Sequence, residues 1–572
     1  MTILGIDLGT TNSLVAVMRD GKPETLANEM DEHLTPSAVA IAADGGLLVG
    51  RAAWDRLVSA PAAGKSFFKR DMGSPTKYSF GDRIWTPTEC SALVLGEMLR
   101  VARLRLGDSV RSAVITVPAY FRENQRQATV EAAHLAGLAV KRIVNEPTAA
   151  ALAYGYRDPA TETRLLVLDL GGGTFDVTAL EIFAGVIEVR ASGGESHLGG
   201  EDYTDALLDL VLKRCGLDRR HRGLGQVRAR IESVKRRLSV QPRVGFVLEG
   251  HELAITRDDL EQAGAELTAR LHPLVMRCMR DADLEPADLD AVLLVGGASR
   301  MHMVQELVRR DLGRPGVADI DPDRVVALGA AVQAALCAGD AAVQDLVLTD
   351  VCAHTLGIAT SKEFVPGETV NGYFSPLIDR NTTVPVSRAR VFQTFHSAQD
   401  EIEVNVFQGE ARLTKDNHLL GTLKVTGLKR PHPELGKIEV RFTYDMSGLL
   451  EVDVTVVHSG VRFHTMLQER PGSLSPAQVE EVRARLAPLK IAARERPVNR
   501  ARLERANRVY QQLVGQAREE LEILLDHFEN ALANEVEENW EAAGREVDAF
   551  LAQIQLEEGG WQPPRDEAGP EP

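Results

Sequence analysis

Two short segments of the sequence combine acidic residues with a turn of glycine and threonine. They read Asp7-Leu-Gly-Thr-Thr-Asn12 and Asp169-Leu-Gly-Gly-Gly-Thr174-Phe-Asp176. Each follows an apolar stretch and precedes another, which predicts a β-hairpin whose tip exposes backbone N–H groups to a phosphate. Threonine hydroxyls can add donors, and Asp7 and Asp169 can hold Mg²⁺ through water, because this cation loses its water reluctantly. The duplicated design predicts two lobes that face each other.

An ordinary hairpin or a different nucleotide motif accounts less well for the sequence. Either segment alone could be a plain hairpin, but acids in matching places of both favour a phosphate site. A near match to the P-loop, Ser59-Ala-Pro-Ala-Ala-Gly64-Lys65-Ser66, lacks the first glycine, contains Pro61 and follows no predicted strand. The sequence also has no G-x-G-x-x-G after a strand, so a dinucleotide-dependent enzyme is not supported.

Length and composition bound the class of protein. The chain has 572 residues, of which 26% are charged and 44% hydrophobic, values typical of folded globular proteins. This length predicts about three or four hydrophobic cores. The net charge of −17 argues against nonspecific binding to nucleic acid or to anionic membranes.

The amino terminus and the cysteines point to an intracellular setting. No basic stretch precedes the first apolar residues, and no apolar run is long enough to span a bilayer, so we expect a cytoplasmic protein without a membrane partner. The 5 cysteines are far apart and form no C-x-x-C pair. We therefore expect reduced, mostly buried thiols rather than disulfides or a zinc site.

The pattern of apolar residues changes along the chain. Residues 1–342 alternate short β-branched runs with helical stretches, as in an α/β domain, and 343–350 are predicted to be a linker. Residues 351–470 alternate apolar with polar residues, which predicts an all-β domain. Residues 471–556 have helical spacing, with an N-cap at Ser475 and an apolar stripe between Leu503 and Phe528, and 557–572 are predicted to be a disordered tail.

Six motifs resemble the DnaK family, the seventy-kilodalton heat-shock chaperones. They are Ile6-Asp-Leu-Gly-Thr-Thr-Asn-Ser13, Val114-Ile-Thr-Val-Pro-Ala-Tyr-Phe121, Val144-Asn-Glu-Pro-Thr-Ala-Ala-Ala-Leu-Ala-Tyr154, the segment 168–177, Leu198-Gly-Gly-Glu-Asp202 and Val295-Gly-Gly-Ala-Ser-Arg300. The resemblance extends from about residue 3 to about residue 460. The short length and Phe68-Lys-Arg-Asp-Met-Gly-Ser74 are most similar to the HscC branch, a bacterial paralogue of DnaK.

The resemblance implies an actin-like α/β ATPase domain of two lobes, a linker, a β-sandwich that binds extended peptides, and a short α-helical lid. The implied ligands are ATP or ADP and Mg²⁺, with K⁺ as a further candidate ion. The implied catalytic residues are Lys69, Glu146, Asp169 and Thr174, and the implied metal site is Asp7, Asp169 and Asp176. The implied nucleotide contacts are Gly9, Thr10, Thr11, Asn12, Gly171, Gly172, Gly173, Gly199, Gly200, Glu201, Glu232, Lys235, Arg236, Ser239, Gly296, Gly297 and Arg300.

The purine end of this implied site has one departure from the family. Glu232, Lys235, Arg236 and Ser239 lie at offsets that place them on one face of a helix, where a guanidinium and an aliphatic stem can sandwich a base. On the opposite wall Ala298 stands where the family commonly has serine. One adenine hydrogen bond is therefore either missing or supplied by Ser299.

The resemblance also implies a peptide site and a route that couples it to ATP. The implied peptide contacts are Ile358, Phe392, Phe395, Ile402 and Val404, and the implied coupling residues are Pro118, Arg126, Arg142, Leu348 and Asp350. Thr349 replaces a usual leucine, which weakens the case for a docked linker. Ser361 replaces an apolar arch residue, Phe395 stands where a smaller side chain or tyrosine is usual, and an insertion occupies 361–376, so we expect narrower or different substrate choice.

The implied function is an ATP-driven chaperone that binds extended hydrophobic segments of unfolded or client proteins. A J-domain cochaperone is the implied partner. Arg237–Ile255 is shorter than is usual in the family, which argues against dependence on a nucleotide-exchange factor. The abbreviated lid predicts fast peptide release. The chain is expected to be a monomer. A narrow-client paralogue, an actin-fold metabolite kinase and a noncatalytic scaffold are alternatives; the basic stretch Arg219–Arg237 lacks the interleaved aromatics of a nucleic-acid site.

Overall fold

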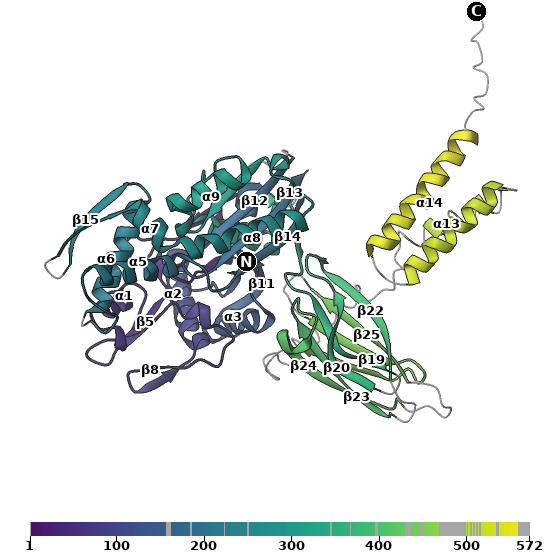
Figure 1. Ribbon diagram of the computed structural model, residues 1–572, viewed down its shortest axis with the longest axis horizontal. Coiled ribbons are helices and arrows are strands. Elements are labelled where there is room, and N and C mark those ends of the chain that lie inside the picture. The colour runs from purple at the N-terminus through teal and green to yellow at the C-terminus, as the bar shows by residue number, and fades with distance from the viewer. Residues whose placement is uncertain are drawn as a thin grey trace, which may run out of the picture.

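The computed structural model describes most of the chain. The described residues are 2–155, 162–183, 186–221, 223–248, 251–343, 346–365, 368–394, 399–428, 436–445, 450–467, single positions between 499 and 513, 516–533 and 537–558. Figure 1 shows two α/β lobes at the left, a β-sandwich at the lower right and a pair of helices at the upper right. The predicted Ser475 cap and the residues after 558 lie outside the described part.

The first lobe is built on a mixed sheet of order β11-β10-β1-β2-β3, with β4 beside β2. The strands are β1 (Ile3–Leu8), β2 (Asn12–Arg19), β3 (Lys22–Thr25), β4 (Thr35–Pro36), β10 (Ser112–Val117) and β11 (Ala139–Asn145). Helices α2 (Pro87–Leu106) and α3 (Glu123–Leu135) cover one face, and their apolar sides complete a core with β1 and β10. Helix α2 begins where Thr86 accepts a hydrogen bond from the Glu89 amide and Pro87 takes the first helical position.

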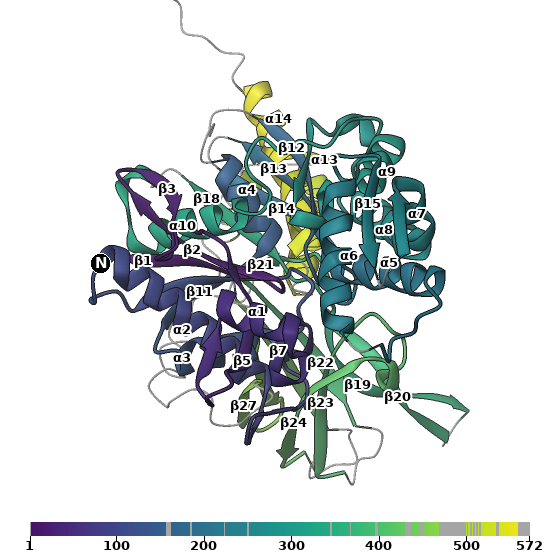
Figure 2. The same ribbon diagram turned by 90° about the vertical axis from the view of Figure 1, so that its left-hand side faces the viewer.

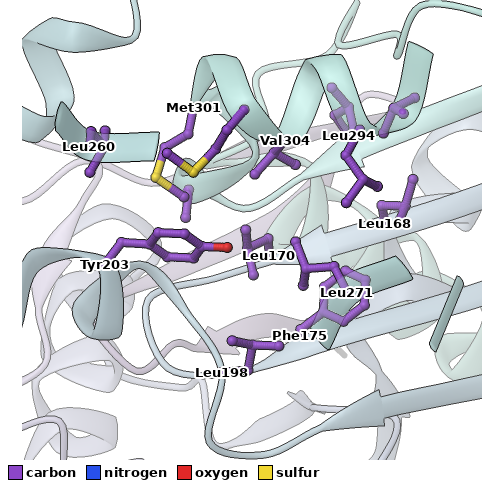
Figure 3. Close-up of a cluster of buried hydrophobic side chains, with 14 of the residues drawn as sticks. Leu168, Leu170, Phe175, Leu198, Tyr203, Leu260, Leu271, Leu294, Met301 and Val304 are labelled. Carbon is purple, nitrogen blue, oxygen red and sulfur yellow. The ribbon is translucent and has the colours of Figure 1, made fainter. Parts of the chain in front are cut away.

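The second lobe repeats this plan with the order β17-β12-β13-β14. Its elements are β12 (Thr163–Leu170), β13 (Phe175–Phe183), β14 (Val186–Glu195), β17 (Ala291–Val295), α5 (Gly200–Arg214), α6 (Leu224–Leu238), α7 (Arg257–Ala263), α8 (Ala265–Asp281) and α9 (His302–Leu312). Figure 3 shows the core between them, where Leu170, Phe175 and Tyr203 are buried. This core fixes the end of β12, from which the second phosphate loop leaves.

Two helices rich in small residues join the lobes, α4 (Glu146–Gly155) and α10 (Val325–Ala338). A Cβ atom added at Gly329 would lie 1.6 Å from the Ala149 carbonyl oxygen, and one at Gly5 would lie 2.2 Å from the Ala331 amide nitrogen. Glycine is therefore required at both positions, because the helix backbones pack directly against each other and against β1.

Smaller elements surround the two lobes. They are β5 (Ala38–Ile41), β6 (Leu47–Val49), α1 (Arg51–Ser59), β7 (Gly64–Ser66), η2 (Phe68–Asp71), β8 (Tyr78–Phe80), β9 (Arg83–Trp85), β15 (Arg243–Leu248), β16 (His251–Thr256) and η4 (Gly297–Arg300). The stretch that looked shortened in the sequence forms the β15–β16 hairpin. All 5 cysteines are free, and all except Cys337 are buried.

The β-sandwich consists of two antiparallel sheets, as the alternating pattern predicts. One sheet has the order β20-β19-β23-β24, from β19 (Leu356–Val365), β20 (Glu368–Ile378), β23 (Glu401–Gln408) and β24 (His418–Thr426). The other has the order β22-β25-β26-β27, from β22 (Val386–Gln393), β25 (Lys437–Tyr444), β26 (Leu450–Val456) and β27 (Arg462–Leu467). Alternate residues such as Val406, Val440 and Phe442 fill the space between the sheets.

The linker is docked, which corrects the expectation drawn from Thr349. Strand β18 (Val347–Val351) adds to the second-lobe sheet parallel to β14, and β21 (Thr383–Val384) pairs with its end. Leu346 and Leu348 are buried in the core shared by the lobes, whereas Thr349 is only partly buried. Backbone hydrogen bonds and alternate leucines hold the strand, so a leucine at 349 is not needed for docking.

The C-terminal pair consists of α13 (Gln516–Ala533) and α14 (Glu537–Glu558). Leu521, Phe528 and Leu551 are buried between them, and Leu503 and Ala506 of the predicted stripe join this cluster. Among the described residues, no helix combines the length and apolar character needed to cross a membrane.

Candidate functional site

A cleft of about 460 Å³ lies between the two lobes. Segments far apart in the sequence line it, including both loops of glycine and threonine, the start of α5, the end of α6 and the turn after β17. The size is suited to a small ligand such as a nucleotide. Almost all the residues that the sequence singles out for ATP and metal line this cleft.

The two phosphate loops meet face to face. The first connects β1 to β2 and the second connects β12 to β13, both as antiparallel hairpins. A Cβ atom at Gly172 would fall 1.9 Å from Thr11 Oγ1, and one at Gly9 would fall 2.1 Å from the Asn12 carbonyl oxygen. Side chains there would displace the opposite loop or distort the turn, so the glycines leave backbone amides accessible at the cleft.

The start of α5 lies against the second phosphate loop. The Gly200 and Glu201 amides are tied to the second loop through the carbonyls of Gly171 and Gly172, at 2.9 and 2.8 Å. Gly200 and Glu201 line the cleft. The positive end of the helix dipole therefore adds to the phosphate loops.

A buried lysine faces a group of carboxylates between the loops. Lys69, in η2, donates a hydrogen bond of 2.5 Å to Glu146 Oε1 at the start of α4. Burial and the charge of Glu146 raise the pKa of Asp7 to about 7 and that of Asp176 to about 8, and burial raises the pKa of Asp169 well above its usual range. Lys69 opposes each of these rises, so its charge partly compensates the cluster.

The carboxylates fit a hydrated divalent cation. Asp7 and Asp169 line the cleft, and Asp176 Oδ2 is buried without a hydrogen-bond partner among the described residues. No three Asp, Glu, His or Cys side chains of the described part come close enough together to enclose an ion directly. A magnesium ion bound mainly through its own water matches this spacing, because Mg²⁺ keeps several waters.

The base end of the cleft is formed by α6 and the turn after β17. Lys235 Nζ is 2.7 Å from Glu232 Oε2 and donates to the Gly200 carbonyl at 2.6 Å. Burial would raise the pKa of Glu232, but Lys235 holds it below its usual value. Arg236 and Ser239 line the same wall. The predicted helical face is therefore present.

The turn after β17 shows whether Ser299 can supply the adenine hydrogen bond that Ala298 cannot make. Ser299 is 1% exposed, does not line the cleft, and donates through Oγ to the Gly296 carbonyl at 2.7 Å. Ser299 therefore does not supply the hydrogen bond that a serine at position 298 would offer. Arg300, on the far side of the turn, donates to Asp321 and Asp323 at 2.7 and 2.9 Å.

Three predicted site residues support the cleft without lining it. A Cβ atom at Gly173 would lie 2.6 Å from Thr10 Cγ2, and one at Gly199 would lie 2.5 Å from the Gly173 amide nitrogen. These glycines allow the loops to approach one another. Asp176 lies behind the second loop and accepts a hydrogen bond of 3.0 Å from the Tyr120 amide.

The predicted coupling residues gather beside the docked linker. Arg126 is 8% exposed and donates to Asn145 Oδ1 at 2.6 Å, and Asn145 Nδ2 donates to Asp350 Oδ2 at 2.9 Å. Burial raises the pKa of Asp350, although Arg126 and Arg142 oppose the rise. Pro118 directly follows the last residue of β10, and Leu348 of the linker is buried in the core shared by the lobes.

The sandwich contacts the lobes through His354, near its start, and through the turn after β20. His354 Nε2 is 3.2 Å from the Tyr120 carbonyl oxygen, and the two rings have centroids 4.1 Å apart. Arg380 and Asn381 donate to Asp281 on α8 at 2.8 and 3.2 Å. The structure therefore joins the sandwich to both lobes.

The predicted peptide residues lie on β19 and β23, which are neighbours in one sheet, and on β22 of the other sheet. Ile358 and Val404 are 4% and 2% exposed, while Phe392 and Ile402 are half-buried against the same core. Phe395 lies outside the described residues. The four described side chains therefore converge on one core, and their contact with a peptide stays a prediction.

Comparisons with known proteins agree with this architecture. The Hsp70 protein family matches the chain over residues 3–80 and 76–558. The chain belongs to the Hsp70 family. Chaperone protein DnaK of Thermotoga neapolitana is 40% identical over 478 residues, which cover 80% of this chain and 79% of that relative, and DnaK of Thermotoga maritima has the same values. Chaperone protein dnaK3 of Thermosynechococcus vestitus is 39% identical over 585 aligned residues, covering 95% of this chain and 84% of the relative.

This Hsp70 protein is therefore an ATP-dependent chaperone with ATPase activity, and its partners are client polypeptides and cochaperones in general. The expected fold is confirmed as the Hsp70 fold of α/β nucleotide-binding lobes, antiparallel β-sheets and C-terminal helices. The metabolite kinase and the noncatalytic scaffold are the wrong alternatives for this chain.

Some residues that line the cleft of this Hsp70 protein were not predicted from the sequence. Leu34, Val240 and Asp323 also line the cleft. Asp323 also accepts a hydrogen bond from Arg300, and a Cβ atom added at Gly297 would lie 2.9 Å from Asp323 Oδ1. The acids Asp321 and Asp323 around Pro322 were the available signal, but nothing in their spacing showed that they pack against the turn after β17.

Proposed function

We propose that this Hsp70 protein is a specialised DnaK paralogue of the HscC kind, which serves a narrow set of clients. The observation that carries this proposal is the β19–β20 hairpin. Ser361 and the inserted residues after it extend these strands beyond Ile358, where pairing between β19 and β23 ends among the described residues. A longer wall beside the proposed peptide site would change which client segments fit.

For hydrolysis we assign roles to this chain's own residues. The two phosphate loops and the start of α5 hold the phosphates, Lys69 stabilises charge on the transferred phosphoryl group, and Glu146 orients the attacking water. Thr174 adds a hydroxyl donor at the second loop. Mg²⁺, when held by Asp7, Asp169 and Asp176, would neutralise phosphate charge; K⁺ as an additional ion stays a prediction.

For coupling we propose that the Arg126–Asn145–Asp350 contacts report the nucleotide state to the linker. These contacts join the end of β11 to β18, so a shift of either lobe would strain them. Opening of the peptide site by ATP and its closure after hydrolysis would follow from docking and release of the linker.

Several finer expectations stay predictions. They are the J-domain protein as the cochaperone, little dependence on an exchange factor, a monomeric state and a cytoplasmic location. No described residue tests them.

The proposal is tested by ATP turnover measured alone, with a panel of extended peptides, and with a J-domain protein. We expect stimulation by the J-domain protein and by only a few of the peptides. Equal stimulation by all apolar peptides would contradict the narrow client set, and no stimulation by any peptide would contradict coupling through the proposed peptide site.

A further inference from the structure

The β19–β20 hairpin has one apolar face that nothing in the described part of the chain covers. Figure 2 shows the hairpin projecting from the edge of the sandwich at the lower right. Phe364 and Val370 on it are 60% and 48% exposed. Single exposed apolar side chains are common, whereas a group of them on one protruding hairpin is typical of an interaction surface.

The two faces of the hairpin differ sharply. Residues opposite each other in an antiparallel pair share a face, so Thr360 lies with Tyr373 and Lys362 with Val370. Gly372, with φ of 90°, forms a bulge that keeps Tyr373 and Val370 on this same face. The opposite face is polar and contains Ser361 paired with Asn371 and Glu363 paired with Thr369.

The apolar face is organised around the Tyr373 ring. Lys362 Nζ lies 4.9 Å from its centroid, the Arg412 guanidinium carbon lies 5.4 Å from it, and the Phe364 ring centroid is 5.8 Å away. We name this set of Lys362, Phe364, Val370, Tyr373 and Arg412 the hairpin platform. Both cations are exposed, and neither forms an ion pair with a carboxylate of the described residues.

The hairpin platform is continuous with the proposed peptide site. Alternate residues of β19 share a face, so Ile358 points to the same side as Thr360 and Lys362. Ile358 is 4% exposed in the sandwich core, and the platform is the part of this face that extends beyond the core. A peptide held next to Ile358 would therefore meet the platform with its flanking residues.

We propose that the hairpin platform is a second client subsite, which selects extended segments carrying acidic residues beside apolar ones. Carboxylates of the client pair with Lys362 and Arg412, and its apolar or aromatic side chains pack on Phe364, Val370 and Tyr373. This inference rests on the proposed peptide site, because the subsite binds the residues that flank the segment held there. It gives a physical origin for a narrow client set.

The test uses the full chain with ADP and two fluorescent peptides that share one apolar core but are flanked by aspartates or by lysines. By anisotropy we expect the wild type to bind the aspartate-flanked peptide about fivefold more tightly. The charge-reversed variant K362E/R412E should invert this preference. The matched control K437E/R462E changes the same net charge at exposed positions of the other sheet and should keep it.

A second variant separates the subsite from the peptide site itself. F364S/V370S should weaken both peptides about fivefold, because it removes apolar contact and leaves the charges. I402Q should abolish binding of both peptides if the proposed peptide site is right. Loss of binding in I402Q with an unchanged preference in K362E/R412E would overturn only the subsite, whereas unchanged binding in I402Q would overturn the proposed peptide site.

Light scattering tests whether a second copy of the chain, rather than a client, occupies the hairpin platform. If the wild type is a dimer that F364S/V370S converts to a monomer without weakening either peptide, a second copy of the chain occupies the platform and the client subsite is wrong. We expect the same mass for both proteins.

Discussion

Replacement of Lys69 by methionine removes the charge that faces the acidic cluster and keeps most of the side-chain length. Lys69 is 3% exposed and its ammonium contacts Glu146 at 2.5 Å. It also opposes the raised pKa values of Asp7, Asp169 and Asp176. The substitution therefore leaves the phosphates of ATP facing carboxylates without this compensating charge.

The magnitude follows from the position of the charge. Loss of one preorganised electrostatic group at a site where charge develops typically costs about 10²–10³ in rate, or roughly 3–4 kcal/mol. The effect on folding should be smaller, about 1–3 kcal/mol, because Glu146 lines an open cleft where water can compensate for the lost partner.

The assay is single-turnover hydrolysis of ATP with Mg²⁺ at saturating protein, with nucleotide affinity and thermal unfolding measured in parallel. Lys65→Met is the matched control, since Lys65 lies near in sequence, stacks on Tyr78 at 5.0 Å and does not line the cleft. We expect Lys65→Met to hydrolyse ATP like the wild type. A Lys69→Met protein that is folded, binds ATP and hydrolyses it within about threefold of the wild type would refute the electrostatic role.

Three further predictions follow from the other contacts. Ile402→Gln should abolish binding of apolar peptides by anisotropy, while ATP binding reports intact lobes; retained affinity would place the peptide site elsewhere. Asp350→Asn should abolish stimulation of ATP hydrolysis by peptide, because it removes the charge beside Arg126 and alters the acceptor of Asn145; normal stimulation would show that the linker contact does not couple the sites. Burial lowers the pKa of His354 from 6.5 to about 4. Neutral His354 therefore favours packing of the sandwich against Tyr120 of the first lobe above pH 6.5. Protonation opposes this packing by up to about 3 kcal/mol as the pH falls toward 4. Hydrogen exchange of β18 should therefore rise between pH 7 and pH 5 after correction for intrinsic rates, and His354→Phe should flatten this rise; an unchanged slope in the variant would exclude His354 as its cause.

The sequence anticipated the chemistry of the cleft because its signals are local. A strand, a turn of glycine and threonine, and a second strand specify a hairpin and an exposed row of amides within a dozen or so residues. Alternation between 351 and 470 likewise predicted the sandwich, since the period of a half-buried strand is visible without its neighbours.

Features that depend on contacts between distant segments were not predictable in this way. The role of Asp323 in the cleft requires the turn after β17 to pack against it, and the orientation of Ser299 depends on its bond to Gly296. The prediction for the linker was wrong because it rested on one side chain, Thr349, in place of the usual leucine. Parallel pairing with β14 is formed by backbone groups, which the sequence does not distinguish.

The amino-acid sequence by itself determined the loops, the order of the domains and the residue types available for phosphate and metal, because each of these is written in short-range patterns. Only the tertiary structure decided which charges face one another, as in the Lys69–Glu146 pair, and which apolar side chains stay uncovered, as in the hairpin platform. The physical reason is that burial and Coulomb interaction depend on distances across the fold, and a sequence pattern specifies those distances only within one element.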